Sequence, residues 1–289
     1  MAQERTSSNT PPTPVPRPGT HRLISAPVRV LPDFLLIGAQ KSGTTDLDRR
    51  ISASPRILPR LTKECRVLTG RRPTTLACRA FQETRFRRSG IERRHGGRAR
   101  AGDACPYYLF HPRTPTTARR LLGPDIDLIV LLRDPAIRAW SHYRHERRLG
   151  METLDFESAL SAEKDRLAGE HQRLRDDPDA VSGPHEHFSY FARGRYADQL
   201  SGWFDAFDRD RFLVLFAEDY FDAPVTVGNR VLSHLGLPAI ESHDRNPALN
   251  SGDDAEPPPD TIRRLRERFA PCNEELHALL ERKPPWPTA

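Results

Sequence analysis

The stretch from Leu31 to Leu47, LPDFLLIGAQKSGTTDL, constrains the fold more than any other part of the chain. Residues 34–37 form a short apolar run typical of a buried parallel strand, and a helical pattern begins at Asp46. Between them lies a turn, residues 38–45, that we call the anion loop. In such a strand–turn–helix unit, free backbone N–H groups and the positive end of the helix dipole converge. The sequence therefore predicts an α/β fold with a binding site for a phosphate-like anion.

The anion loop is close to the nucleotide-binding motif of kinases and NTPases but departs from it at the lysine. That motif, G-x-x-x-x-G-K-[ST], needs Lys directly after the second glycine. Here Gly38 and Gly43 have the right spacing, but Thr44 follows Gly43, and Lys41 lies two residues before it. A P-loop-like kinase or NTPase is therefore disfavoured and stays as an alternative, whereas anion binding is still predicted.

A second candidate anion site follows the strongest buried-strand signal in the chain, IDLIVLL at residues 126–132. Arg133 and Asp134 come directly after it, and Pro135 suits the first turn of a helix that would carry Ser141 two turns farther on. A guanidinium and a hydroxyl are groups that bind phosphate. Because ligands bind at the carboxyl ends of parallel strands, we expect this site to share one sheet edge with the anion loop.

Together the two motifs resemble the PAPS-dependent sulfotransferase family (PAPS is 3′-phosphoadenosine-5′-phosphosulfate). KSGTT after an apolar strand is similar to the 5′-phosphosulfate loop of that family, and R-D-P-x-x-R-x-x-S-x-Y is similar to its 3′-phosphate motif. The resemblance covers about residues 31–280 and implies a P-loop-like three-layer α/β/α domain with a mainly parallel central sheet. It also implies PAPS as cofactor, PAP (the desulfonated nucleotide) as product, and no metal. Cofactor binding is assigned to Lys41, Ser42, Gly43, Thr44, Thr45, Arg133 and Ser141.

A Lys-Glu pair, Lys63 and Glu64, extends the resemblance to the glycan (heparan-sulfate-type) branch of the family and its bacterial relatives. In that branch a glutamate at about this distance after the loop is the general base. The resemblance gives this role to Glu64, and makes Lys41 the group that stabilises charge on the leaving phosphate. A Lys-Glu pair is usually a surface ion pair. Only the position of this pair after the anion loop favours a catalytic role. Substrate-binding roles are assigned to Lys63, Arg66, Asp103 and His142.

Residues 98–110, RARAGDACPYYLF, fit another outline of the family, which has an acidic residue, a proline and a tyrosine. Cys105 replaces the usual hydroxyl residue, and Ala104 stands where some glycan sulfotransferases place a substrate-side lysine. Arg66 or Arg113 would then have to supply that cation. The alternative, from the residues alone, is a core strand followed by a proline turn. The residues that fit the outline are Asp103, Pro106 and Tyr108.

His142 follows Ser141 on the predicted helix. Another branch of the family uses a catalytic histidine, but that histidine precedes the 3′-phosphate motif. We therefore predict that His142 packs against the protein or touches the edge of the substrate. The predicted reaction is in-line sulfuryl transfer to a hydroxyl or amine of a small-molecule or glycan acceptor, and a carbohydrate or glycosylated metabolite fits the Lys-Glu pair best.

The rest of the chain alternates strand and helix patterns, which favours a mainly parallel sheet. Residues 1–26, rich in Pro, Ser and Thr, are predicted to be a disordered tail, and residues 27–289 a single sulfotransferase domain. Further strands are predicted at residues 56–61 and 212–216, and helices at residues 75–86, 115–122, 154–167, 196–207, 225–235 and 261–280. Residues 87–100, 170–186 and 246–259 are predicted loops, and the second of them is a candidate lid.

Charge and hydropathy narrow the function further. The net charge of +6 suits an anionic ligand, and two of the four lysines lie in the motifs above. A basic nucleic-acid-binding protein is a second alternative, but no helix–turn–helix, finger or RNP-type signature supports it. No apolar run approaches the ~20 residues that cross a bilayer, and no signal-peptide pattern is present. We expect a cytoplasmic protein without stable membrane insertion or nucleic-acid partner, with four free cysteines and no zinc site. The sequence leaves the oligomeric state open.

Overall fold

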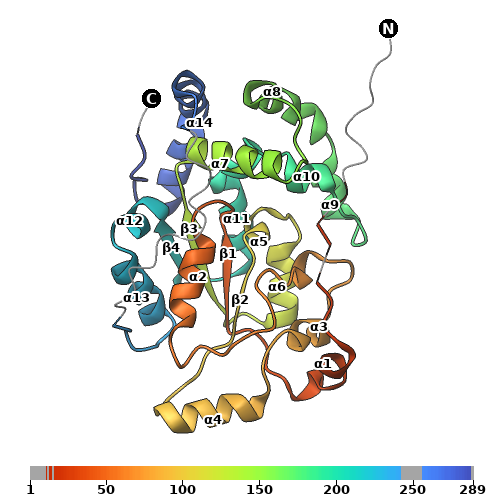
Figure 1. Cartoon of the computed structure of the whole chain (residues 1–289), viewed down its shortest axis with the longest axis vertical. Helices are drawn as coiled ribbons and strands as arrows, with labels where there is room; N and C mark the ends of the chain where they lie inside the picture. The colour runs from red at the N-terminus through yellow and green to blue at the C-terminus, as the bar shows by residue number, and fades with distance from the viewer. Residues whose placement is uncertain (1–10, 12, 15, 242–255, 288–289) are drawn as a thin grey trace.

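A four-stranded parallel sheet forms the centre of the computed structural model, which describes residues 11, 13–14, 16–241 and 256–287 (Figure 1). The strand order within the described part is β2-β1-β3-β4, and every neighbouring pair is parallel. The predicted fold class is confirmed, and the two strands predicted from the most apolar runs, β1 and β3, are the central pair. The strands are β1 (Phe34–Gly38), β2 (Gly102–Ala104), β3 (Asp127–Leu132) and β4 (Phe212–Phe216).

Both faces of the sheet are covered by helices, which explains why its central strands are apolar throughout. Successive residues of β1 alternate between two apolar clusters: Leu35 and Ile37 belong to one, Phe34 and Leu36 to the other. One cluster contains residues of α5 (Tyr107–Phe110), α6 (Thr114–Leu122), α11 (Tyr196–Ala206) and α14 (Pro259–Leu280). The other contains residues of α2 (Thr44–Ser52), α12 (Ala217–Asp222) and α13 (Pro224–His234). The sheet and its two helical layers give the predicted α/β/α arrangement.

A third apolar cluster joins α7 (Pro135–Arg148), α8 (Phe156–Arg166) and α14. These helices lie at the top of Figure 1, above the sheet. The loop predicted at residues 170–186 is wrong, because this segment contains α9 (Glu170–Asp176) and α10 (Gly183–His187). Its helices are short and highly charged, so the sequence shows no helical repeat of apolar residues. Hydrogen bonding supports α10 instead, since Ser182 Oγ accepts from the backbone N–H of His185 at 3.0 Å.

Two predictions for residues 56–95 are also wrong. The strand predicted at residues 56–61 is reduced to a single bridge between Ile57 and Arg100, because Pro59 has no N–H to donate to a ladder. The helix predicted at residues 75–86 is two helices, α3 (Thr75–Ala80) and α4 (Arg85–His95), and α4 occupies most of the predicted loop. Thr84 starts the second helix by accepting a hydrogen bond from the backbone N–H of Arg87.

The end of the predicted disordered tail is folded. Residues 20–24 form α1 (Thr20–Ile24), and Arg22 donates to the carbonyls of Ala80 (2.7 Å) and Gln82 (2.8 Å). Ala26 is buried at the start of a short 3₁₀ helix, η1 (Ala26–Val28). The prediction is therefore wrong for residues 20–26, and residues 1–10 lie outside the described part. The loop predicted at residues 246–259 also falls largely outside it. The other 3₁₀ helices are η2 (Val67–Thr69), η3 (Ala192–Gly194) and η4 (Arg209–Arg211).

Three of the cysteines, Cys65, Cys78 and Cys105, are buried thiols, and Cys272 is partly buried. Among the helices that the structure describes, none is both long enough and apolar enough to cross a bilayer. The division of the chain into a tail and one domain spanning residues 27–289 stays a prediction, because part of both segments is outside the described residues.

Candidate anion-binding and catalytic site

The anion loop connects the end of β1 to the start of α2. Gly43 adopts a left-handed backbone conformation (φ 91°) and precedes the first residue of α2, Thr44. The first turn of that helix has no side-chain cap in the described structure; the Asp46 N–H donates to the Gly43 carbonyl, whereas the N–H groups of Thr44 and Thr45 are open to a ligand. Ser42 adds a second donor: its hydroxyl is fully buried and has no hydrogen-bond partner among the described residues. Both features fit an anion, which would supply the missing acceptor oxygens.

Arg133 follows β3 and reaches the anion loop directly. Its Nη1 donates to the backbone carbonyl of Lys41 at 3.0 Å, while its own carbonyl accepts from the Tyr196 hydroxyl at 2.9 Å. The carboxyl ends of the two central strands therefore meet as predicted, and the two basic residues lie at one edge of the sheet. This confirms the expected juxtaposition, whereas the ligand of each residue stays a prediction.

The charges at this edge lack acidic partners. No carboxylate of the described residues lies within ion-pair distance of Lys41 or Arg133, although both are partly buried. Burial, together with the nearby Arg148 and Arg133, lowers the pKa of Lys41 to about 8. Burial also lowers the pKa of the Arg133 guanidinium. Unpaired, partly desolvated cations are costly unless a ligand neutralises them, so the site is suited to an anion.

Lys63 and Glu64 lie beside the start of α2. The ammonium of Lys63 donates to the Thr45 hydroxyl at 3.0 Å and to the Glu64 carboxylate at 2.6 Å. Glu64 has a left-handed backbone conformation (φ 57°), its N–H donates to the Ala104 carbonyl, and its side chain is 45% exposed. A non-glycine residue in this conformation is uncommon and often found at functional sites. The Lys-Glu pair thus joins the anion loop, and its carboxylate is open to an incoming molecule.

Ser141 and His142 lie near the middle of α7. Asp134 caps this helix by accepting from the Ala136 N–H at 2.9 Å, and it is held by Arg266 of α14 through two hydrogen bonds. Ser141 is partly exposed, as a ligand contact requires. His142 is fully buried, with Nε2 at 3.2 Å from the Glu146 carboxylate, and burial lowers its pKa. The structure therefore supports packing for His142 and not contact with the substrate.

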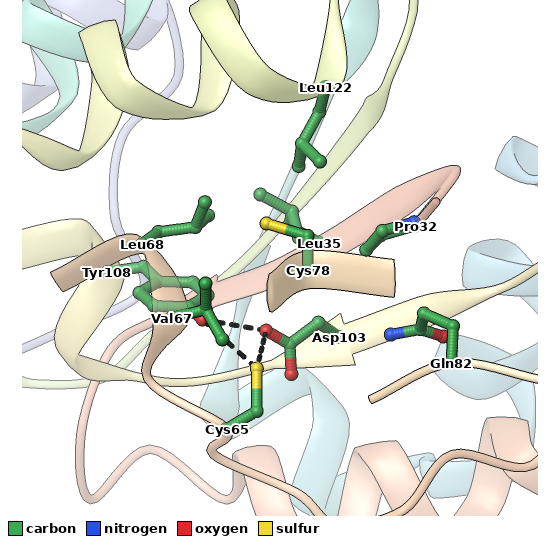
Figure 2. Close-up of a pocket in the computed structure, with 10 residues that line it drawn as sticks. All are labelled: Pro32, Leu35, Cys65, Val67, Leu68, Cys78, Gln82, Asp103, Tyr108 and Leu122. Atoms are coloured by element: carbon green, nitrogen blue, oxygen red, sulfur yellow. Dashed lines mark hydrogen bonds between the residues drawn. The ribbon is translucent and has the colours of Figure 1, made fainter. Parts of the chain in front are cut away.

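Asp103 belongs to the core, which corrects its predicted role at the substrate. The residue lies on β2 and is 3% exposed. Figure 2 shows its carboxylate accepting hydrogen bonds from the Tyr108 hydroxyl (2.7 Å) and the Cys65 thiol (3.0 Å). The adjoining cavity of about 10 Å³ holds at most one water molecule. The alternative of a core strand followed by a proline turn is confirmed, since α5 begins directly after Pro106.

The two arginines proposed to replace a lysine at Ala104 have other partners. Arg66 forms a buried ion pair with Glu186, and its guanidinium lies 5.0 Å from the centre of the Tyr107 ring. The predicted substrate contact of Arg66 is therefore not supported, because its charge is already neutralised. Arg113 is partly buried and donates to the Ala180 carbonyl at 3.4 Å. Within the described residues, Lys63 is the cation that contacts Glu64.

Sequence reasoning underestimated two residues of this edge. Arg193 is 2% exposed, donates to the Gln40 side chain in the anion loop, and is held by the carbonyls of His185 and Glu186. Phe221 of α12 was missed: its ring is 44% exposed, and a Cβ on Gly43 would approach it to 2.9 Å. The Arg133 guanidinium lies 5.6 Å from the ring centre. The signal in the sequence that could have indicated Phe221 was its position shortly after β4, at the same sheet edge.

No group of three His, Cys, Asp or Glu side chains in the described part of the chain is arranged to hold a metal ion. The charge at the site is instead supplied by fixed side chains and helix N–H groups. These can bind an anionic group at the anion loop and a second one near Arg133. The exposed carboxylate of Glu64, next to the loop, can accept a proton from a molecule placed against the first anion.

Residues 31–251 match the family model described as "Sulfotransferase domain". The membrane-associated sulfotransferase kil1 of Dictyostelium discoideum is 30% identical over 129 residues, which is 44% of this chain. The match spans about a quarter (26%) of that relative's length.

Solved structures with similar folds were also found. A sulfotransferase from Alicyclobacillus acidocaldarius superposes with a TM-score of 0.66 and 27% identity, covering 88% of this chain and 97% of the other. A mouse sulfotransferase complexed with PAP gives a TM-score of 0.47 and 16% identity, covering 91% of this chain and 92% of the other.

Proposed function

The chain belongs to the family of sulfotransferase domains, and we propose that it transfers the sulfuryl group of PAPS to a hydroxyl of a carbohydrate or glycosylated metabolite. Family membership makes PAPS the cofactor and PAP the product. It also decides against the two alternatives from the sequence, a P-loop-like kinase or NTPase and a nucleic-acid-binding protein. The roles of individual residues and the class of acceptor are our inference from the geometry.

The observation that carries the proposal is the contact between the two anion sites. Arg133 donates to the carbonyl of Lys41, and neither side chain has a carboxylate partner in the described structure. A nucleotide with phosphate groups at two ends would neutralise both cations together. We assign its 5′-phosphosulfate to the anion loop, with Lys41, Ser42 and the N–H groups of Gly43, Thr44 and Thr45. We assign its 3′-phosphate to Arg133 and Ser141.

PAPS supplies an activated sulfuryl group, and the residues of the chain handle the proton and the charge. Glu64 takes the proton of the acceptor hydroxyl. The acceptor oxygen then forms a bond to sulfur as the bond from sulfur to the 5′-phosphate oxygen breaks. Lys41 and the helix N–H groups stabilise the negative charge that develops on the departing phosphate oxygen. Lys63, bonded to Thr45 and Glu64, positions the base beside the loop.

Replacement of Glu64 by Gln tests the assignment of the base. We expect the turnover number with labelled PAPS and an oligosaccharide acceptor mixture to fall by about 10²–10⁴-fold, as for loss of a general base. The affinity for PAP, measured by calorimetry, should stay within about twofold, because Gln keeps the size of the side chain and Glu64 does not contact the nucleotide. Glu267→Gln, at an exposed site on α14, is the matched control. Normal turnover of Glu64→Gln would show that another group is the base.

A further inference from the structure

The segment that carries the proposed base, residues 64–66, has a constrained backbone. Glu64 and Arg66 both have a left-handed conformation (φ 57° for each), on either side of Cys65. Residues other than glycine seldom adopt this conformation, and they keep it only where contacts from the rest of the protein hold them. The N–H of Glu64 is held by the Ala104 carbonyl, and the Cys65 thiol donates to the Asp103 carboxylate. The contacts of Arg66 therefore decide how the other end of the segment is held.

Glu186 of α10 is the partner that holds Arg66. The two side chains form an ion pair, and both residues are buried. The second carboxylate oxygen of Glu186 accepts from the backbone N–H of Thr13 at 3.0 Å. The Arg66 guanidinium also lies 5.0 Å from the centre of the Tyr107 ring. Because a buried charge that loses its partner is poorly solvated, replacement of Glu186 by a neutral residue would favour movement of Arg66 toward water.

The same helix also contacts the anion loop, through Arg193 of η3. Arg193 donates to the backbone carbonyls of His185 (3.2 Å) and Glu186 (2.8 Å) in α10. It also donates to the side chain of Gln40, which immediately precedes Lys41 in the anion loop. α10 is thus connected to the cofactor loop by its backbone carbonyls and to the base segment by the Glu186 side chain. The two connections can be separated by mutation, because a change of the Glu186 side chain keeps the carbonyl that Arg193 bonds.

We propose that Glu186 is a positioning residue for the reaction: through Arg66 it holds Glu64 where its carboxylate can take the proton of the acceptor. This inference rests on the proposed function and adds a residue to the same site. Proton transfer needs the base within hydrogen-bond reach of the acceptor hydroxyl, so a small shift of the base segment lowers the rate of transfer. The carboxylate of Glu186 bonds Arg66 and Thr13, which lie outside the anion loop, so its loss should lower turnover and leave nucleotide binding unchanged.

Replacement of Glu186 by Gln tests this role, because the amide keeps the size of the side chain and cannot neutralise Arg66. In the free protein we expect hydrogen exchange of the peptide that spans residues 60–70 to become at least about tenfold faster, measured by mass spectrometry. With labelled PAPS and an oligosaccharide acceptor mixture, the turnover number should fall about ten- to a hundredfold. The affinity for PAP, measured by calorimetry, should stay within about twofold.

Glu152→Gln is the matched control, because Glu152 also forms a buried ion pair, with Arg166 at the end of α8. It should leave both the exchange of residues 60–70 and the turnover number within about twofold of the unmodified protein. Equal changes in the two Gln variants would mean that Glu186 has only a general structural role, and an unchanged turnover number in Glu186→Gln would also overturn the inference. If Glu186→Gln does not fold, the double variant Arg66→Gln/Glu186→Gln replaces it with the same expected changes, because it contains no unpaired charge.

A second double variant shows whether Glu186 acts through the base. Adding Glu186→Gln to Glu64→Gln should lower the residual turnover number less than about twofold, because the base that Glu186 positions is already absent. Losses that multiply would place the effect of Glu186 elsewhere and would contradict the inference.

The remaining outcomes separate this inference from the proposed function. If the protein binds PAP and Glu186→Gln turns over normally, the positioning role fails and the sulfotransferase proposal stands. If Glu64→Gln alone turns over normally, or the protein does not bind PAP, the proposed function fails at the base or at the cofactor, and this inference fails with it. If the unmodified protein does not act on the acceptor mixture, the proposed carbohydrate acceptor is contradicted, and the exchange of residues 60–70 still decides whether Glu186 holds the base segment.

Discussion

Lys41 and Arg133 are held in place by the backbone rather than by acidic side chains. Arg133 donates to the carbonyl of Lys41, and Tyr196 fixes the carbonyl of Arg133. Because their charges are not neutralised within the described protein, each cation can interact fully with a ligand. A carboxylate partner would have to be displaced first, which would reduce the net gain. The buried hydroxyl of Ser42, which has no partner in the described structure, is also free for a ligand, because it gains a hydrogen bond only when an acceptor binds.

The lowered pKa of Lys41 leads to a prediction about pH. Its pKa is about 8 in the free protein, so the ammonium loses its proton as the pH rises through that value. An anion binds the charged form better, and binding must therefore weaken on the alkaline side. Between pH 7.5 and pH 9.5 we expect the affinity for PAP to fall by about tenfold, measured by calorimetry.

Lys41→Arg is the control for this pH dependence, because a guanidinium stays charged throughout that range. The variant should show an affinity for PAP that changes little between pH 7.5 and pH 9.5, even if its affinity is lower overall. An equal decline in both proteins would assign the pH dependence to another group.

At the scale of elements, the loops that follow parallel strands build the site. β1 leads to the anion loop, β3 to Arg133, and β4 to α12 with its exposed Phe221. The hydrogen bond from the Asp134 N–H to the Glu218 carboxylate joins the last two of these loops. Trp286 donates to the same carboxylate, and Arg266 of α14 holds Asp134, so the C-terminal residues brace the site from outside the sheet.

We expect Phe221 to contact the base of the nucleotide. Its ring lies against Gly43 of the anion loop and next to Arg133, so it is close to a residue of each proposed phosphate site. Stacking of a base on an aromatic side chain contributes about 1–3 kcal/mol, so Phe221→Ala should weaken PAP binding by roughly five- to a hundredfold. The affinity of Phe221→Ala for inorganic pyrophosphate, which has no base, should equal that of the unmodified protein.

Phe86→Ala is the matched control for this prediction, because Phe86 is also exposed and lies on α4, away from the anion loop. It should leave the affinity for PAP unchanged. If Phe221→Ala binds PAP as tightly as the control does, the ring does not contact the nucleotide.

The sequence predicted those elements whose signals are local. β1 and β3 are continuous apolar runs because both faces of the sheet are covered, and the Gly38–Thr45 spacing marks the anion loop. β2 was found only as an alternative, since three residues give almost no periodicity. α9 and α10 were missed because their short, charged sequences have no apolar periodicity. Ser182 caps α10, whose residues are buried, whereas α9 has no side-chain cap and buries only Leu174.

The candidate site was predictable where its residues lie in motifs, and not where contacts are distant in sequence. As their motifs suggested, Arg133 contacts Lys41 of the anion loop, and the Lys-Glu pair contacts the same loop at Thr45. Asp103 fits the sequence outline of a substrate residue, but its carboxylate is bonded to Tyr108 of the same outline and to Cys65, which lies far earlier in the chain and which no local pattern pairs with it. Arg66 is neutralised by Glu186, far along the chain, and that partner is equally invisible in the sequence.

At the scale of the whole molecule, the ends of three strands converge on one site. The cofactor edge collects the ends of β1, β3 and β4. The Lys-Glu pair joins this edge because Lys63 donates both to Thr45 of the anion loop and to Glu64. The side chain of Glu64 is exposed, so an acceptor can approach the proposed base from solvent while a nucleotide occupies the anion loop.

The central claim is that Lys41 and Arg133 bind opposite phosphate ends of one nucleotide. Calorimetry with PAP, adenosine 5′-phosphate and adenosine 3′-phosphate tests it most directly, on the unmodified protein and on Lys41→Ala and Arg133→Ala. The unmodified protein should bind PAP more tightly than either monophosphate. Arg133→Ala should bind PAP no more tightly than adenosine 5′-phosphate. Lys41→Ala should bind PAP no more tightly than adenosine 3′-phosphate. Equal losses for all three nucleotides in both variants, or no preference for PAP in the unmodified protein, would contradict the claim.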